Sequence, residues 1–342
     1  MPTSALVARR APVLGPGLAG LAVLLAGVAF LSVTHGSRDI GLADVWHAVT
    51  TMRTHGSITS TVTLELRVPR TLLGILVGAA LGLAGAILQG VTRNALADPG
   101  IMGINAGAAA FVVVAITVLG VRGIGSYVWF GFAGALLATV LVYSIASLGR
   151  EGATPVKLAL AGAAVTAGLS SLTTGIVMTN VDALNELRFW QVGSLAGRYY
   201  PILTGVAPFL IVGLFAALAC GRALNGLALG EDVARGLGQR VQLTRATTFG
   251  IVAVLAGAAT AACGPIVFVG LVVPHIARFL CGPDYRWILP YSMLLAPIVL
   301  LLADVVGRVV GAPGELQVGV VLALLGAPVF VFLVRRARLA EL

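Results

Sequence analysis

The sequence predicts an all-α membrane protein with about ten transmembrane helices. Of its 342 residues, 58% are hydrophobic and only 10% are charged, against about 25% charged in water-soluble domains. The apolar residues form long runs without the alternation of strands. Because hydrocarbon offers no hydrogen-bond partners to the backbone, such runs must be helical. A span needs about 20 residues, so we expect a single transmembrane domain over residues 1–342 with little chain outside it.

The expected spans are separated by glycine, proline and charged residues. The eighth is short, and the first lacks the cleavage site of a signal peptide, so we expect it to be retained. Long connections are expected at residues 35–69 and 180–201 on one side and at 221–245 on the other. In order, the predicted spans are residues 12–33, 70–90, 103–121, 127–148, 158–178, 202–220, 246–263, 265–280, 287–307 and 318–334.

The net charge of +9 comes from basic residues scattered singly or in pairs between the apolar runs. This is the distribution of loop charges rather than of a nucleic-acid-binding face, so we expect membrane lipid and no nucleic acid as a partner. More of these residues fall on the side that would carry both termini. The positive-inside rule therefore predicts that both termini are cytoplasmic.

Sequence patterns for catalysis and for metal binding are absent. The chain has no G-x-x-x-x-G-K-[ST] loop for phosphates, no H-E-x-x-H and no G-x-S-x-G motif, and its four histidines share no motif. Cys220, Cys263 and Cys281 have neither metal-ligand spacing nor a disulfide framework. We therefore expect no catalytic site, no metal site and no cofactor bound by this chain. Any ATP, with its Mg, would be bound by a separate subunit.

Asp304 is the acidic residue deepest in a predicted span, within LLADVVGR. An ionisable residue inside a membrane is a functional candidate, and here it would be a proton relay. However, Arg308 follows four residues later on the same helix face. An internal ion pair near the end of the ninth span is the alternative.

Gly74, Gly78 and Gly82 lie at intervals of four residues in the second predicted span. This spacing places three small residues on one helical stripe, which lets another helix approach closely. We therefore expect a packing face, although a chain with 44 glycines also produces such spacings by composition alone.

The connection at 221–245 contains a predicted short helix, in the segment NGLALGEDVARGLGQR. Glycines divide the segment, and Glu231 and Asp232 suit the first turn of a helix. Val233 and Leu237 share one face. Such a helix either docks in a partner's groove or lies on its own bundle.

Six blocks in order resemble one known family. The longest, at 67–110, reads RVPRTLLGILVGAALGLAGAILQGVTRNALADPGIMGINAGAAA and closely resembles the permeases of cobalamin and ferric-siderophore ABC importers, often called FecCD-type. The resemblance covers nearly everything from Arg67 onward, whereas residues 1–66 fit by hydropathy alone. The other blocks are LALAGAAV at 158–165, LALGEDVARGLG at 227–238, GPIVFVGLVVPHIARFL at 264–280, LLADVVGR at 301–308 and LQVGVVLALLGAPVFVFLVRR at 316–336.

The resemblance implies an importer subunit in a bacterial cytoplasmic (inner) membrane. A second permease, identical or related, would complete a central pathway, with two ATPase subunits below and a substrate-binding protein above. The cargo would be a metal chelate, first a ferric siderophore, then haem or cobalamin. The segment 221–245 would be the loop that meets the ATPase, which we call the coupling segment. Its expected contact residues are Gly230, Glu231, Asp232, Arg235 and Gly238.

Arg67 and Arg308 match positions at which the family uses arginines to engage acidic residues of the binding protein. A guanidinium group can bind a carboxylate through two hydrogen bonds, and both residues fall at predicted outer helix ends. For Arg67 and Arg70 the alternative is anchoring at the membrane interface, which accounts for Arg70 better than for Arg67.

The translocation pathway of the family is lined mainly by its fifth and tenth helices. In the fifth, Ser170, Ser171 and Thr174 are the expected pathway residues. Small uncharged walls would let a large chelate pass without binding it tightly.

Two functions from other classes remain as alternatives. An ion-coupled secondary transporter would use Asp304 as its proton site and broken helices as its substrate site, but it leaves the coupling segment without a role. A membrane-embedded enzyme lacks a nucleophile or ligand set in this sequence.

Overall fold

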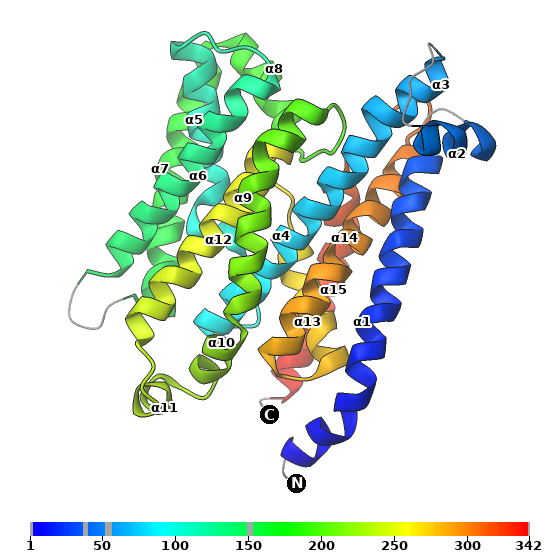
Figure 1. Ribbon diagram of the computed structural model, residues 1–342. Helices are drawn as coiled ribbons and strands as arrows, with labels where there is room; N and C mark the ends of the chain where they lie inside the picture. The colour runs from blue at the N-terminus through cyan, green and yellow to red at the C-terminus, as the bar shows by residue number, and fades with distance from the viewer. Residues whose placement is uncertain (1–2, 37–39, 52–56, 149–152, 341–342) are drawn as a thin grey trace.

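The computed structural model describes residues 3–36, 40–51, 57–148 and 153–340, and within these ranges the regular structure is entirely helical (Figure 1). Most helices run roughly along one direction as a bundle. In chain order the helices are α1 (Thr3–Thr34), α2 (Leu42–Thr51), α3 (Ile58–Thr61), the π-helix η1 (Val62–Arg67), α4 (Val68–Thr92), the 3-10 helix η2 (Pro99–Met102), α5 (Ile104–Val118), α6 (Ile124–Ala146), α7 (Pro155–Thr179), α8 (Val181–Gln191), α9 (Tyr200–Ala219), α10 (Gly221–Ala228), α11 (Glu231–Gly236), α12 (Val241–Cys263), α13 (Val269–Cys281), α14 (Tyr285–Val310) and α15 (Val318–Ala340).

The predicted spans correspond to helices. Among the described residues, seven helices are long and apolar enough to cross a membrane, and three shorter apolar helices lie at 104–118, 269–281 and 318–331. Together these match the predicted runs in order, including the short eighth. The all-helical, multi-span prediction is confirmed.

The two ends of the bundle differ in what they carry. The first turn of α1 and the last turn of α15 lie at the end that also holds α10 and α11, whereas α2, α3 and α8 lie at the other end (Figure 1). We call these the terminal end and the opposite end. The chain therefore begins and finishes on the side of the predicted coupling segment.

Helix α4 forms the centre of the bundle. It packs against α14, α12, α13 and α9. In the continuous helix 58–92, of which α4 is the main part, 83% of the residues in the most apolar stretch are buried. By contrast, only 17% of the residues in the most apolar stretches of α1 and α7 are buried. Most of the apolar surface of α1 and α7 is therefore left for lipid or for other subunits.

The glycine stripe of α4 faces α14. A Cβ atom at Gly78 would lie 2.6 Å from the Cα atom of Pro297, and one at Gly82 would lie 2.7 Å from the carbonyl oxygen of Ser292. At Gly74 the nearest atom would be the Cδ2 atom of Leu301, at 2.6 Å. Backbone contacts this close leave no room for a side chain, so the two helices approach along this stripe.

Helix α13 is short because residues that disfavour helices flank it. It begins after the Gly264–Pro265 interruption and ends at Gly282, which has φ +82°. Inside it, Pro274 has no N–H to donate to the carbonyl group of Gly270. The neighbouring carbonyl group, of Leu271, accepts a hydrogen bond from the Gln89 side chain of α4 at 3.1 Å.

The helix that contains the second predicted span starts earlier than the sequence suggests. Residues 58–67 were expected to lie in a long connection, but α3 and η1 continue α4 to a combined length of 35 residues. The N–H group of Val68 donates to Thr63, five residues earlier. Pro69 cannot donate at all. The π-helical turn accommodates this missing donor, so the helix passes through the proline region without ending.

Candidate functional site

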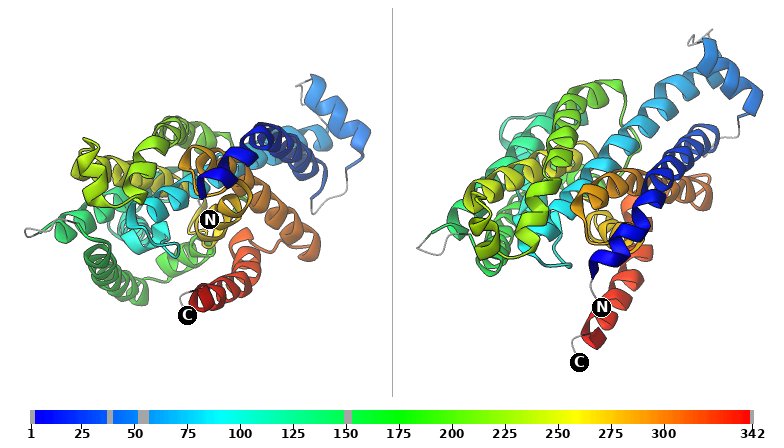
Figure 2. Two further views of the ribbon diagram at one scale, coloured as in Figure 1. Left: turned by 90° about the horizontal axis from the view of Figure 1, so that it is seen from below. Right: turned by 60° about the horizontal axis from the view of Figure 1, so that its bottom comes forward.

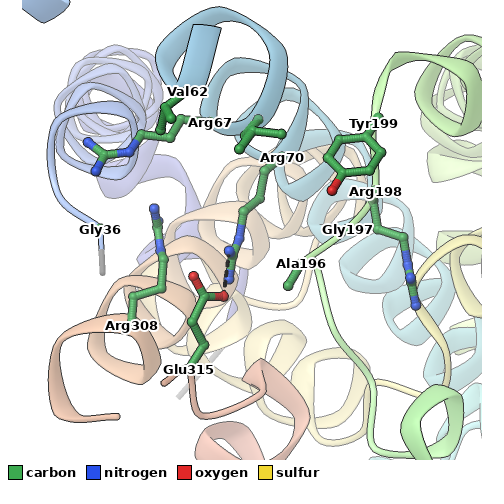
Figure 3. Close-up of a pocket in the computed structure, with 11 residues that line it drawn as sticks. Gly36, Val62, Arg67, Arg70, Ala196, Gly197, Arg198, Tyr199, Arg308 and Glu315 are labelled. Atoms are coloured by element: carbon green, nitrogen blue, oxygen red, sulfur yellow. Dashed lines mark hydrogen bonds and ion pairs between the residues drawn. The ribbon is translucent and has the colours of Figure 1, made fainter. Parts of the chain in front are cut away.

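An arginine-rich pocket lies at the opposite end of the bundle. Its volume is about 220 Å³, and four arginines and one glutamate are among its lining residues (Figure 3). The residues come from the α1–α2 connection, η1, α4, the α8–α9 connection and the region around the end of α14. The lining residues are Gly36, Val62, Leu66, Arg67, Arg70, Ala196, Gly197, Arg198, Tyr199, Arg308 and Glu315.

Asp304 lies beside this pocket and is paired with two arginines. Its carboxylate lies 3.0 Å from Arg308 Nη2 and 2.7 Å from Arg70 Nη2, and its side chain is 1% exposed. The i, i+4 pair that the sequence suggests is present, and Arg70 of α4 joins it. Arg70 also reaches Glu315 at 2.8 Å. The network therefore ties α4 to α14 and to the α14–α15 connection.

Arg308 is held by several contacts within the chain. Its Nη1 donates to the carbonyl groups of Ser32 at 2.9 Å and His35 at 2.8 Å. Its Nη2 donates to Ser32 Oγ at 2.9 Å and pairs with Asp304. Its Nε donates to the carbonyl group of Asp304 at 3.4 Å. These contacts fasten α14 to α1.

Arg67 is also held from within. It is 5% exposed, and its Nη1 donates to the carbonyl groups of Val33 at 3.0 Å and Thr34 at 2.7 Å, at the end of α1. Figure 3 shows Arg67 on the side of the pocket near Gly36. The structure thus places both Arg67 and Arg308 at one pocket, and their contact with a binding protein stays a prediction.

Sequence reasoning did not single out Arg198. It is 9% exposed, and its Nε has no hydrogen-bond partner among the described residues. Figure 3 shows its guanidinium group turned away from Arg70 and Glu315. Burial lowers the pKa of Arg198, and Cys263, the last residue of α12, lies among the groups that influence it.

The coupling segment forms two short helices at the terminal end, α10 and α11, and runs into the first turn of α12. Gly230, with φ +109°, makes the turn between them, a conformation that favours glycine. As predicted from the sequence, Glu231 and Asp232 occupy the first turn of α11. Val233 and Leu237 are 49% and 70% exposed. The segment therefore presents apolar side chains away from the bundle.

Polar side chains of α10 and α11 contact the helices that follow them. Glu231 pairs with Arg245 of α12 and, at 3.0 Å, with Arg235. In α10, the Asn225 side chain donates to Asp284 at 2.6 Å and accepts a hydrogen bond from the backbone N–H group of Tyr285 at 2.8 Å. The segment is thus connected to the starts of both α12 and α14.

Ser170, Ser171 and Thr174 lie on an exposed face of α7. Near them, a Cβ atom added at Gly168 or Gly175 would meet no atom within 4 Å. Helices α7 and α15 both lie along the lower edge of the left view of Figure 2. The two helices that the resemblance assigns to the pathway therefore lie on the same flank.

Possible metal ligands are dispersed in the described part of the chain. No group of three or more His, Cys, Asp or Glu residues there is placed to hold a metal ion. The three cysteines are separate free thiols at helix ends. The polar clusters described above consist of ion pairs and helix-end hydrogen bonds.

A model of the FecCD transport family matches residues 24–336. The chain belongs to this family. The match covers the arginine pocket, the coupling segment and α7. Residues 24–66, which the sequence blocks did not reach, also fall within the FecCD match.

FecCD relatives cover nearly the whole chain. The ferric enterobactin transport system permease protein of Escherichia coli (strain K12) is 46% identical over 318 residues, covering 93% of this chain and 94% of that protein. The iron(3+)-hydroxamate import system permease protein FhuB of Bacillus subtilis (strain 168) is 43% identical, covering 94% and 83%. A solved structure described as an inward-facing metal-chelate type ABC transporter has a TM-score of 0.80 and 29% identity, covering 94% of this chain and 99% of that one.

Proposed function

We propose that this chain is the transmembrane permease subunit of an ABC importer that carries a ferric siderophore. The observation that supports this most strongly is the FecCD match over residues 24–336, together with 46% identity to a ferric enterobactin permease along 93% of the chain. Haem and cobalamin are the next candidates for the cargo. The transported chelate is a substrate and not a resident cofactor.

Hydrolysis of ATP takes place on a partner in this proposal. The sequence has no phosphate-binding loop, so ATP and Mg bind to two copies of a separate ATPase subunit. These subunits dock on the coupling segment, where Val233 and Leu237 are exposed. The terminal end therefore faces the cytoplasm, and both termini lie there. The chain resides in a bacterial inner membrane.

A second permease, either a second copy of this chain or a paralogue, completes the pathway. Support comes from the exposed flank of α7 with Ser170, Ser171 and Thr174. Two such flanks facing each other enclose a passage whose walls combine these hydroxyl groups with apolar side chains. A binding protein delivers the chelate at the opposite end and engages Arg67 and Arg308, which exchange their internal hydrogen bonds for contacts with its acidic residues.

The surroundings of Asp304 favour this proposal over ion-coupled transport. A proton-relay carboxylate must exchange protons with a pathway, but Asp304 is 1% exposed and paired with two guanidinium groups. Its contacts indicate a structural role.

Two experiments test the proposal. Affinity purification of the detergent-solubilised chain from its native membrane should recover an ATPase subunit and show whether a different permease accompanies it. A strain lacking the gene should lose ATP-dependent uptake of a radiolabelled ferric siderophore. Uptake that persists without any partner ATPase would refute the proposal, whereas selective loss of haem or cobalamin uptake would change only the cargo.

A further inference from the structure

The two acidic residues at the start of α11 face different surroundings. Asp232 is 99% exposed and pairs with Arg235 at 3.1 Å. Glu231 is 29% exposed, and its Oε1 accepts a hydrogen bond from Arg245 of α12 while its Oε2 accepts one from Arg235. Glu231 is therefore turned toward the bundle, not toward the surface that a partner would meet.

Arg245 is the buried member of this pair. It lies near the start of α12, and its side chain is 4% exposed. In the described part of the chain, Glu231 is the carboxylate within ion-pair distance of Arg245. Removing one partner of a buried ion pair leaves the other charge uncompensated, which is strongly unfavourable. The position of Glu231 is thus tied to that of α12.

Helix α12 connects this pair to the opposite end of the bundle. Its 23 residues span about 35 Å at 1.5 Å per residue. At its far end, the carbonyl group of Cys263 accepts a hydrogen bond from the N–H group of Ser194 at 2.7 Å. Just after Ser194 in the chain, residues Ala196 to Tyr199 line the arginine pocket. One continuous helix therefore joins the coupling segment to the wall of that pocket.

We propose that Arg245 is a positioning residue that holds Glu231, and with it α11, against the base of α12, so that α12 moves when the coupling segment moves. Glu231 acts as an internal brace in this arrangement, while Asp232, Val233 and Leu237 form the outward surface. The transport consequence rests on the proposed function, but the placement of α11 does not.

The first test needs the permease alone. Hydrogen exchange of the full chain in lipid nanodiscs is compared between the wild type and Arg245→Gln. We expect the amides of residues 231–239 to exchange about tenfold faster or more, the change that follows the loss of a charge-assisted hydrogen bond, while the middle of α12 is unchanged. Unchanged exchange at 231–239 would overturn the proposal.

The second test uses the complex with the ATPase recovered by affinity purification. Glu231→Arg and Arg245→Glu should each lose the stimulation of ATP hydrolysis by the binding protein, and the doubly reversed chain should regain it. Arg122→Gln is the matched control, because Arg122 forms an exposed ion pair with Asp182 at 3.8 Å. It should keep full stimulation.

The outcomes separate the two proposals. The positioning role is refuted if either single reversal keeps wild-type stimulation, or if the double reversal fails to restore it. Where a single reversal prevents assembly, recovery of assembly and stimulation in the double variant supports the role, and lack of recovery overturns it. If the wild-type chain binds no ATPase at all, the proposed function fails, and the exchange experiment alone decides the placement of Glu231.

Discussion

Asp304 illustrates how one residue gains its role from a distant part of the chain. Its spacing from Arg308 is visible in the sequence, but Arg70 lies 234 residues away and reaches it only in the folded protein. With both arginines present, the buried carboxylate balances two cations that otherwise lack sufficient solvation. The residue is then a structural counter-ion for the end of the bundle that carries the arginine pocket.

We expect Asp304→Asn to destabilise the protein by on the order of 3 kcal/mol, because it removes the ion-pair partner of buried Arg308 and leaves Arg70 with Glu315 alone. Thermal unfolding of the detergent-solubilised chain measures this. Asp182→Asn is the control, since Asp182 is 78% exposed in a loose ion pair and should change stability by about 0.5 kcal/mol or less. A stable Asp304→Asn protein that has lost transport would instead support the proton-relay interpretation.

Asp284 caps the start of α14 and is linked to the coupling segment. Partial burial raises the pKa of Asp284, but hydrogen bonds from Arg286 and Asn225 outweigh this effect and hold the pKa below its usual range. The ionised carboxylate therefore stabilises the folded state above the unfolded pKa of about 3.9, and this contribution declines as the pH falls through the lower folded value.

We expect Asp284→Ala to lower stability at pH 7 by about 1 kcal/mol, the usual loss for a helix cap. The difference from wild type should be full above about pH 5 and should narrow once the pH falls below about 4. Thermal unfolding across this range tests the prediction. A difference that stays constant down to pH 3 would show that the charge of Asp284 contributes nothing.

At the scale of elements, close packing of α4 on α14 depends on residues without side chains. Gly78→Ala would place a Cβ atom 2.6 Å from the backbone of Pro297. Because a backbone cannot move aside cheaply, we expect a loss of about 1–3 kcal/mol, measured as a lower unfolding temperature.

Gly20→Ala provides the comparison for this substitution. Gly20 lies in α1, and a Cβ atom there would meet nothing within 4 Å. Since alanine favours helix by about 1 kcal/mol over glycine, this change should be neutral or stabilising. Equal losses at Gly20 and Gly78 would mean that helix contact is not the cause.

Element boundaries were predictable where proline and glycine fall outside helices, as at Gly264 and Pro265. They were not predictable at Pro69, where the π-helical residues 62–67 carry the helix past a proline. Helix α8, in the predicted connection 180–201, was likewise missed. Its apolar residues are interrupted by charged ones, so its sequence lacks the continuous hydrophobicity that reveals a span.

At the scale of the whole molecule, α7 provides the test of the pathway. Thr174→Trp would place a bulky ring on the exposed flank, and we expect severe loss of siderophore uptake with ATPase binding retained. Val23→Trp on α1 is the control, because Val23 is 74% exposed on a helix whose surface is expected to meet lipid. Uptake that is unaffected by Thr174→Trp would place the pathway elsewhere.

The chain's hydrophobic pattern and ordered sequence blocks were sufficient to predict the spans, the membrane class and the family. The spans can be predicted from local sequence, because each span must satisfy its own backbone hydrogen bonds in hydrocarbon. The start of α11 at Glu231 was equally predictable, since acidic residues favour the first turn of a helix.

Only the tertiary structure decided which side chains share a site. It brought Arg70 to Asp304, Arg245 to Glu231 and Asn225 to Asp284, and it showed that Arg308 is held by contacts with α1 and Asp304. Such pairs join residues from different helices, and their geometry depends on how the helices pack. Composition and spacing along one helix do not show which other helix lies against it. The sequence therefore cannot tell which arginine on another helix will reach a given carboxylate.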